Sequence, residues 1–286
     1  MAYISQQQRN YSVVMMCRVL EVSKSGFYEW KKEPISIRKR EEIVIIAGIK
    51  EAFEESRGVY GSPRIHAALS KKGIKCGRHR VARLMRKSNI RSKTKRKFKV
   101  TTDSSHKLPV AENTLNRDFS PSQANQAWAQ DITYIWTEEG WLYLAVVIDL
   151  FSRKVIGWSL RDNMKKELVI DALDMAIRSR KPGTSLLVHS DRGSQYCSAL
   201  FQAKLKAHKM ICSMSGKGEC WDNAVAESFF HSLKTEHIYL NKFITREEAI
   251  QSIFEFIEVF YNRIRLHSTL GFCSPVEYEG ELLNVA

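Results

Sequence analysis

Leu186-Leu187-Val188-His189-Ser190-Asp191 is an apolar run that ends on an acid, and it predicts a buried strand with a carboxylate at its end. Further along, Asp222-Asn223-Ala224-Val225-Ala226-Glu227-Ser228-Phe229-Phe230-His231-Ser232-Leu233-Lys234 has the pattern of an amphipathic helix. Because one turn takes 3.6 residues, Glu227, His231 and Lys234 lie on one face, together with Asn223. Phe229, Phe230 and Leu233 point to other sides of the helix, where they can pack into a hydrophobic core. A strand and a helix are therefore each expected to carry an acid into the folded interior.

A third acid, Asp131, interrupts the strand-like run Trp128-Ala129-Gln130-Asp131-Ile132-Thr133-Tyr134-Ile135. Between Asp131 and Asp191 lie 59 residues, and between Asp191 and Glu227 lie 35. Buried charges are costly unless something neutralises them, and a divalent metal could do so for all three. Oxygen ligands without thiols or clustered imidazoles favour Mg²⁺, with Mn²⁺ possible, over Zn²⁺. Two such ions about 3.5–4 Å apart would suit phosphodiester displacement, whereas the plain alternative is three unrelated surface acids.

The flanking sequence predicts five strands and several helices. Three strands with short connections are followed by alternating helices and strands, in the order β-β-β-α-β-α-β-α-α. The expected strands cover 128–136, 141–150, 155–160, 185–189 and 211–214, and helices cover 165–180, 198–208, the Glu227 segment and 246–263. This order predicts an α/β domain with a mixed sheet flanked by helices, over residues 125–279. Arg263, Arg265 and His267 follow the last helix and could contact DNA or only cap that helix.

Charge is distributed unevenly along the chain. Residues 1–110 hold 26 Lys and Arg against 9 Asp and Glu, whereas residues 111–286 hold 19 against 22. The formal net charge of +14 therefore comes wholly from the N-terminal part. Such an asymmetry predicts a module that binds a polyanion, most simply a nucleic acid, joined to a nearly neutral one.

The N-terminal part has an all-α pattern. Residues 1–34 predict a short helical segment of two helices around a serine-rich turn, compatible with a helix-turn-helix or with a purely structural pair. Residues 38–92 predict a helix-turn-helix domain, in which Ser62 is expected as an N-cap and Pro63 as the first helical residue.

Its last helix is basic, and 11 of the 22 residues from 78 to 99 are Lys or Arg. The density favours phosphate contacts over a merely solvated face. The expected DNA-binding residues are Arg78, Arg80, Arg83, Arg86 and Lys87 in this helix, Lys217 in a glycine-rich loop, and Lys234 beside the acids.

Residues 93–124 lack apolar periodicity and predict a basic, polar linker, and residues 280–286 predict a tail. The six cysteines form no C-x-x-C pair, which indicates reduced thiols in a cytoplasmic protein. No apolar run reaches the length of about 18 residues that a membrane span needs, so no membrane association is expected.

Three motifs carry a specific resemblance. They are Trp128-x-x-Asp131-Ile132-Thr133-Tyr134, His189-Ser190-Asp191-x-Gly193-Ser194-Gln195-Tyr196, and Asp222-Asn223-Ala224-x-Ala226-Glu227 with Lys234 seven residues beyond the glutamate. They resemble the integrase-core motifs of bacterial insertion-sequence transposases of the IS-three family, including the gap of 35 residues. Tyr261-Asn262-x-x-Arg265-x-His267 and Tyr60-Gly61-Ser62-Pro63-Arg64-Ile65 are similar to further parts of that family. One departure is Glu219, where a neutral residue is expected.

The resemblance implies a ribonuclease-H-like fold and a DDE site formed by Asp131, Asp191 and Glu227. It implies a magnesium-dependent transposase that nicks the 3′ ends of its element and joins them to double-stranded target DNA. The chain resembles the product of the family's second reading frame, so the resemblance also implies a protein partner from the upstream frame. Joining two ends implies a homo-oligomer on DNA, and the expected location is the bacterial cytoplasm, at the nucleoid. Two alternatives stay open: a ribonuclease-H-like nuclease that does not join strands, and a DNA-binding regulator with an inactive core.

Overall fold

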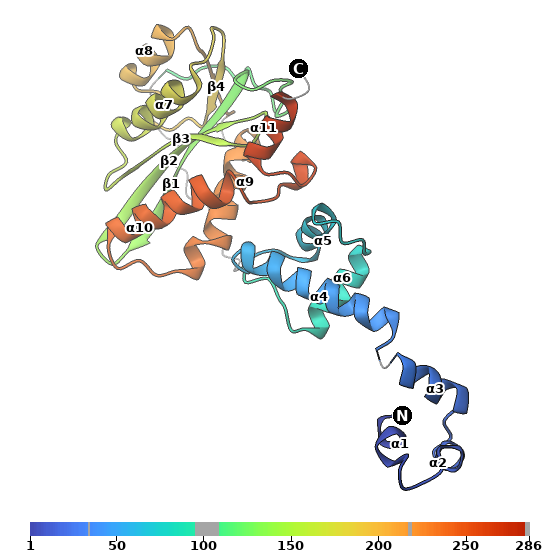
Figure 1. Cartoon of the computed structure of the whole chain (residues 1–286). Coiled ribbons are helices and arrows are strands. Elements are labelled where there is room, and N and C mark those ends of the chain that lie inside the picture. Colours follow the sequence, from blue (N-terminus) through green and yellow to red (C-terminus); the bar gives the residue numbers. More distant parts are fainter. Residues whose placement is uncertain (34, 95–108, 217–218, 284–286) are drawn as a thin grey trace. The chain divides into compact units, whose positions relative to one another are not determined.

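The computed structural model describes residues 1–33, 35–94, 109–216 and 219–283, and the chain forms two compact units, residues 1–92 and 93–286 (Figure 1). None of the described helices combines the length and the apolar character needed to cross a membrane.

The first unit begins with three short helices, α1 (Ala2–Gln7), α2 (Val13–Val19) and α3 (Lys24–Lys32). They share a small core made of Ile4, Met16, Cys17 and Phe27. The two helices expected within residues 1–34 correspond to α2 and α3. Helix α1 was not expected from the sequence, because it is short, largely polar and buries only Ile4.

The rest of the first unit consists of α4 (Ile37–Glu55), α5 (Ser62–Lys71) and α6 (Arg78–Lys87). Helices α4 and α5 come so close that a Cβ on Gly48 would lie 2.6 Å from a methyl carbon of Leu69. The expected cap is off by one residue, since α5 begins at Ser62 itself and the extended Gly61 is its N-cap. Pro63 lies in the first turn, where its missing N–H costs nothing.

The second unit contains the expected mixed sheet of five strands, in the order β3-β2-β1-β4-β5 (Figure 1). Strands β1 (Ala127–Thr137), β2 (Gly140–Asp149) and β3 (Val155–Arg161) are antiparallel neighbours. Strands β4 (Leu187–Ser190) and β5 (Ile211–Met214) continue the sheet in parallel. The β-β-β-α-β-α-β order predicted from the sequence is confirmed, with boundaries that differ by one or two residues.

Helices cover both faces of this sheet. Neighbouring strand residues point to opposite faces, and on β3 the Gly157 face contacts α7 (Lys166–Arg180), whereas the Trp158 face contacts α10 (Arg246–Phe254) through Phe254. A Cβ on Gly157 would lie 2.2 Å from the carbonyl oxygen of Ala172, so only glycine lets α7 pack this closely. Helix α8 (Ala199–Ala207) adds Phe201 and Leu205 to the core under α7, and α9 (Ala224–Glu236) packs against β1.

The helix expected over residues 246–263 changes its winding. Helix α10 ends at Phe254, and a π-helical segment, Glu255–Tyr261, continues it. The chain then turns back into α11 (Pro275–Leu283), whose Glu279 accepts a hydrogen bond of 2.6 Å from Ser152 and pairs with Lys154 and Arg180.

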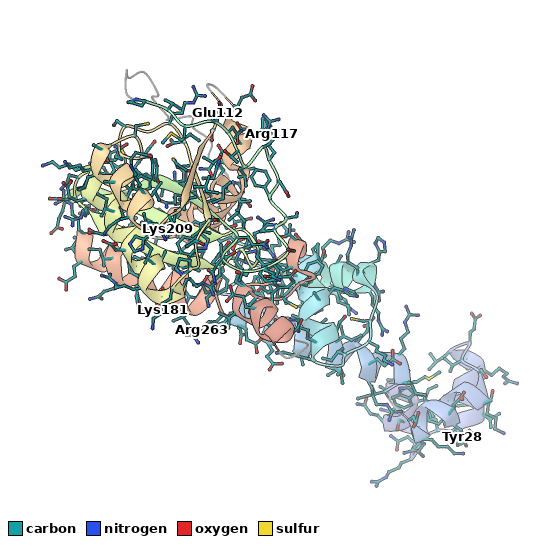
Figure 2. All side chains as sticks on the ribbon, turned by 90° about the horizontal axis from the view of Figure 1, so that it is seen from above. Tyr28, Glu112, Arg117, Lys181, Lys209 and Arg263 are labelled. Carbon is teal, nitrogen blue, oxygen red and sulfur yellow. The ribbon has the colours of Figure 1, made fainter. Side chains whose placement is uncertain are left out.

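The described part of the expected linker, residues 109–124, is packed on the second unit. Leu115 is buried beside Ala127 and Leu150, and its backbone N–H donates to Ser213 Oγ at 3.0 Å. The carbonyl of Glu112 accepts from the backbone of Met214 at 3.3 Å, which extends the pairing beyond β5. Glu112 and Arg117 both lie at this edge of the unit (Figure 2). This segment contributes single anchoring residues and not a periodic pattern, so the sequence gives no sign of its docking.

A buried ion pair ties α9 to the C-terminal segment. Arg265 donates to both carboxylate oxygens of Glu236, at 2.7 and 2.8 Å, and to Ser232 Oγ at 2.9 Å. The side chains of Arg265 and Glu236 are 5% and 6% exposed. Arg265 and His267 are thus buried, and of the three residues that could have contacted DNA only Arg263 is exposed.

We expect Arg265→Met to lower the free energy of unfolding by about 3–5 kcal/mol, because it removes the guanidinium that pairs with the buried carboxylate of Glu236. Chemical denaturation of the full chain measures this change. The double variant Arg265→Met with Glu236→Leu should regain most of the loss, and Arg263→Met, at an exposed position, should stay within about 0.5 kcal/mol of the parent. A cost below about 1 kcal/mol for Arg265→Met, the value typical of an exposed pair, would contradict the buried pair.

Candidate active site

The three acids are positioned where two strands separate. Strand β4 pairs with β1 only from Ala127 to Ala129, so Asp131 lies just beyond the last paired residue. Asp191 follows directly after β4 ends at Ser190. Glu227 lies in the first turn of α9, and the side-chain amide of Asn223, the residue before α9, donates to the carbonyl of Gln130 at 3.0 Å. That hydrogen bond attaches the start of the helix to the edge of β1 that β4 leaves open.

The acids act on one another electrostatically. Burial raises the pKa of Asp131 well above its ordinary value, and the charges of Asp191 and Glu227 raise it further. The backbone N–H of Ile132 and the charge of Lys234 act in the opposite direction. Burial also raises the pKa of Glu227. Because such charge effects weaken with distance, these three carboxyl groups and Lys234 belong to one site.

Local hydrogen bonds fix two of the carboxylates. Asp131 Oδ1 accepts from the backbone N–H of Ile132 at 2.8 Å, and Asp191 Oδ1 accepts from the N–H of Gly193 at 2.9 Å. Glu227 is exposed on its helix. Hydrogen bonds thus orient Asp131 and Asp191, whereas Glu227 extends from the first turn of its helix.

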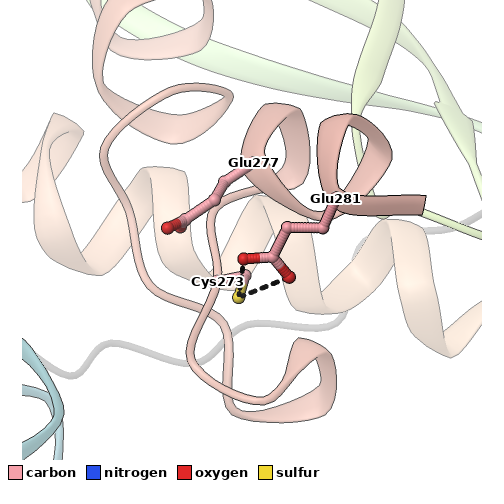
Figure 3. Close-up of side chains that lie close together, drawn as sticks. All are labelled: Cys273, Glu277 and Glu281. Atoms are coloured by element: carbon pink, nitrogen blue, oxygen red, sulfur yellow. Dashed lines mark hydrogen bonds between the residues drawn. The ribbon is translucent and has the colours of Figure 1, made fainter. Parts of the chain in front are cut away.

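The three acids do not close on one point. Among the described residues, the one group of three potential metal ligands whose donor atoms all lie within 4.8 Å is Cys273, Glu277 and Glu281 (Figure 3). That group has a structural explanation, since Ser274 and Glu277 exchange hydrogen bonds at the start of α11 as in a capping box. The donor atoms of Asp131, Asp191 and Glu227 are thus not all within 4.8 Å of one another.

The donor set fits a hard divalent cation. The oxygen donors are carboxylates without a thiol among them, and the raised pKa of Asp131 indicates negative charge that lacks sufficient compensation. Mg²⁺ and Mn²⁺ prefer such oxygen ligands.

A second set of contacts holds the chain between β5 and α9. Asp222, in the short 3-10 helix Cys220–Asn223, accepts from Gly216 N and Asn113 Nδ2 at 2.8 Å each and from Arg117 Nε at 2.6 Å. Burial acts to raise the pKa of Asp222, but these bonds outweigh it and the pKa is lowered. Arg117 also pairs with Glu219 at 2.6 Å, so the unexpected acid of this loop has a counter-charge. Sequence reasoning missed Arg117 and Asn113, because they lie about a hundred residues from their partner.

The two histidines next to the acids differ. His189 is fully buried, and its ring nitrogens lie 2.9 Å from Ser213 Oγ and 3.2 Å from Ser215 Oγ. Burial lowers the pKa of His189 to about 4, so the ring is neutral at physiological pH. His231 is exposed on α9. His189 therefore serves as a rigid support for the end of β4.

Lys234 lies between the acids and an aromatic ring. Its ammonium is 5.1 Å from the centre of the Tyr134 ring, and burial lowers its pKa, while the charge of Asp131 raises it. Tyr196, also buried near the acids, has a pKa raised well above its ordinary value by burial and by the charges of Asp131 and Asp191. Neither tyrosine was singled out as a site residue from the sequence.

The expected DNA-binding residues of α6 fall into two groups. Arg80 donates twice to Glu41 at 3.0 Å, and Glu42 accepts from Arg83 at 3.2 Å and from Lys87 at 3.1 Å. These three cations are thus paired with acids of α4. Arg78 and Arg86 are exposed, and within the described part of the chain neither forms an ion pair. Lys217, the remaining expected contact, lies outside the described residues.

Comparison with family models matches two parts of the chain. An integrase core domain matches residues 121–220 and again residues 227–283, and an HTH-like domain matches residues 39–98.

Curated relatives match almost the whole chain. The chain is 47% identical to the transposase InsF for insertion sequence IS3A of Escherichia coli (strain K12), over 98% of both proteins. It is 45% identical to the uncharacterized 31 kDa protein of insertion element IS600 from Shigella sonnei, over 92% of this chain and 97% of that protein.

Two solved structures are more distant. A simian T-cell lymphotropic virus intasome in complex with PP2A regulatory subunit B56 gamma gives a TM-score of 0.47 at 16% identity, covering 75% of this chain and 70% of that one. The HTLV-2 integrase catalytic core domain in complex with magnesium gives 0.39 at 16% identity, covering 55% and 98%. Similarity at this level supports no conclusion about this chain.

The relatives at 45–47% identity do show the family of this chain, because they match it nearly from end to end and their family is the one that its motifs resemble. The chain belongs to the transposase family of the IS3 insertion sequences, and it carries that family's integrase catalytic core.

Proposed function

We propose that this transposase is a Mg²⁺-dependent polynucleotidyl transferase, with Mn²⁺ as a possible substitute, and that Asp131, Asp191 and Glu227 are its catalytic and metal-binding residues. The observation that carries the proposal is the placement of Asp131 at the open edge of β1, directly beside the end of β4 with Asp191 and the start of α9 with Glu227. Burial, followed by the charges of Asp191 and Glu227, raises the pKa of Asp131, and a divalent cation at this place would stabilise its ionised form.

The proposed reaction has two displacements. In the first, a water oxygen attacks a phosphodiester at each 3′ end of the element, the P–O bond to the 3′ oxygen breaks, and that oxygen leaves as a 3′-hydroxyl. In the second, this hydroxyl attacks a phosphodiester of the target DNA, a new P–O bond forms, and the target's own 3′ oxygen leaves. Bound divalent ions would supply activation of the attacking oxygen and stabilisation of the leaving one.

The chain's own residues position the DNA strand. Lys234 is close enough to act on the charge of Asp131, so its ammonium can hold a phosphate next to the acids. Asp191 is fixed by Gly193, and the Asp222–Arg117 contacts hold the chain that leads into α9 and so support Glu227. Buried, neutral His189 keeps the end of β4 rigid without adding charge.

We further propose that the first unit binds double-stranded DNA, both element ends and target, through α6. Arg78 and Arg86 are its most direct phosphate contacts, since Arg80, Arg83 and Lys87 must first compete with Glu41 and Glu42. Lys217 stays a proposed contact of the loop before α9. The proposed division of the chain is a helical segment (1–34), a helix-turn-helix domain (38–92), a connecting segment (93–124), the catalytic core (125–279) and a tail.

The proposed reaction determines which partners the protein needs. Two element ends must be held together before they are joined, which requires a homo-oligomer on DNA. A protein from the upstream reading frame is a further proposed partner, and the proposed place of action is the bacterial nucleoid. A nuclease that does not join strands and a regulator without catalysis are the rival functions, and intact acids at all three positions disfavour the regulator.

Asp191→Asn should abolish both nicking and joining of labelled element ends in Mg²⁺, because it removes a charge that metal binding needs. The loss should exceed the roughly 10–100-fold that weakened outer support of a metal site typically costs. Joined products, nicks and bound complexes are resolved separately on gels. Binding should stay measurable, and Asp171→Asn, which changes an exposed acid of α7, should be close to the parent. Full activity of Asp191→Asn would refute the site, and nicks without joining by the parent would favour the nuclease.

The double variant Arg78→Gln with Arg86→Gln should flatten the dependence of DNA affinity on salt, because each lost phosphate contact lowers the slope of log K against log [salt] by about 1. Affinity titrations on element-end DNA at several salt concentrations measure the slope. The matched variant Arg80→Gln with Arg83→Gln removes the same formal charge but should change the slope less, since those cations are paired with Glu41 and Glu42. Equal slopes for the parent and the Arg78/Arg86 variant would remove this face of α6 from the interface.

A further inference from the structure

Two large rings are exposed at the end of the β1–β2 hairpin. Trp136 is 57% exposed and Trp141 is 43% exposed, whereas Trp128 on the same strand as Trp136 is fully buried. The rings of Trp136 and Trp141 meet edge to face, with centroids 4.9 Å apart, and Tyr134 meets Trp141 in the same manner at 5.0 Å. The result is a continuous aromatic surface made of Tyr134, Trp136 and Trp141.

The strand register explains where this surface lies. Trp136 and Trp141 are directly paired across the two strands, and Tyr134, two residues before Trp136, points to the same face. Closer to β4 that face is covered, because Trp128 belongs to the core under α7. Helix α7 packs mainly against β3 and β2, and the hairpin end extends past it. The three rings are thus left at the surface, on the part of β1 that runs on from Asp131.

The aromatic surface is connected to the catalytic residues. The Lys234 ammonium lies 5.1 Å from the centre of the Tyr134 ring, and its charge acts on Asp131. Contacts therefore run from Lys234 through Tyr134 to the two exposed tryptophans, and the charge of Lys234 links this surface electrostatically to Asp131. A DNA strand whose phosphate is held at Lys234 would pass its neighbouring nucleotides along these rings.

We propose that Tyr134, Trp136 and Trp141 form a stacking platform for unpaired bases of the DNA strand that is cut, next to the scissile phosphate. The proposal rests on the proposed function, because it needs a DNA strand at Asp131. Exposed aromatic rings beside a cation are the arrangement by which proteins hold single-stranded nucleic acid, and stacking tolerates any base. The platform would keep a few base pairs open at the cut, which gives the strand room to reach the acids.

The charges around the hairpin favour bases over phosphates as the ligand. The turn itself carries Glu138 and Glu139, and Glu139 accepts a hydrogen bond from the backbone of Arg246 at 2.8 Å. The guanidinium of Arg246 also lies at the turn and donates to the carbonyl of Trp141 at 3.3 Å, so the two acids exceed the cations there by one and disfavour a duplex backbone. Ring faces with the cation of Lys234 at one end instead suit a short unpaired stretch, held at one phosphate.

The test compares two element-end DNA molecules that differ only in pairing. One is a full duplex, and the other has three mismatched, splayed base pairs at the cleavage site. Affinities are measured with a chelator present, so that no strand is cut, for the full-length parent, for Trp136→Ala with Trp141→Ala, and for Trp136→Phe with Trp141→Phe. The parent should prefer the splayed DNA, the alanine variant should lose about tenfold of that preference, and the phenylalanine variant should keep most of it. Duplex affinity should be the same for all three.

Leu200→Ala provides a control for the loss of an exposed apolar side chain, because Leu200 is 52% exposed but lies on α8 and not on the aromatic surface. Equal affinity of the parent for both DNA molecules, or an unchanged preference in the alanine variant, would overturn the platform. A changed oligomeric state in light scattering, with the preference intact, would also overturn it and mark the surface as a protein contact. Strand joining by the parent on the same DNA reports on the proposed function separately, since the binding comparison needs no catalysis.

Discussion

The burial of Asp131 beside two further carboxyl groups is the constraint around which the candidate site is arranged. Asp131 is taken out of water at the point where β1 and β4 separate, and the nearby charges of Asp191 and Glu227 make its ionisation harder still. A fold normally avoids such a group or pairs it with a cation, as Arg265 pairs with Glu236 in the same unit. Here the only opposing side-chain charge among the causes of the shift is that of Lys234. Under the proposed function, the cost of burying this carboxyl group is offset when a ligand that brings positive charge binds.

The surrounding structure explains why the acids do not simply move apart. Asp191 is fixed by Gly193, the end of β4 is supported by buried His189, and Asn223 attaches the start of α9 to the open edge of β1. Arg117 and Asn113 hold Asp222 from a segment that comes before the sheet in the sequence. Each of these contacts joins residues from different elements. The site is thus held by its neighbours while its own members repel.

Much of the fold and of the candidate site could be predicted from the sequence, and the features that could not be predicted share one cause. The strand order and the acids could be found because apolar runs ending in Asp191, or interrupted by Asp131, are local patterns. The pairing of Arg80, Arg83 and Lys87 with Glu41 and Glu42 could not, because those partners lie about forty residues away and only the packing of α4 on α6 brings them together. The docking of residues 109–124 depends likewise on distant single partners. Periodicity identifies an element and its buried face, but it does not identify what that face or a lone polar side chain will contact.

The distribution of charge along the chain constrains how DNA can be handled. The excess positive charge comes wholly from residues 1–110, whereas residues 111–286, which include the three acids, hold 19 Lys and Arg against 22 Asp and Glu. Under the proposed function, a strongly cationic core would neutralise the acids that are proposed to bind the metal. Concentrating the excess positive charge before residue 111 supplies non-specific attraction to phosphates without adding that charge to the core. The proposed contacts of the core with the strand are then few and short-range, a single lysine at the site and uncharged rings beside it. In this proposal, long-range electrostatic attraction of DNA comes from the N-terminal part of the chain, and short-range recognition of the cut strand comes from the core.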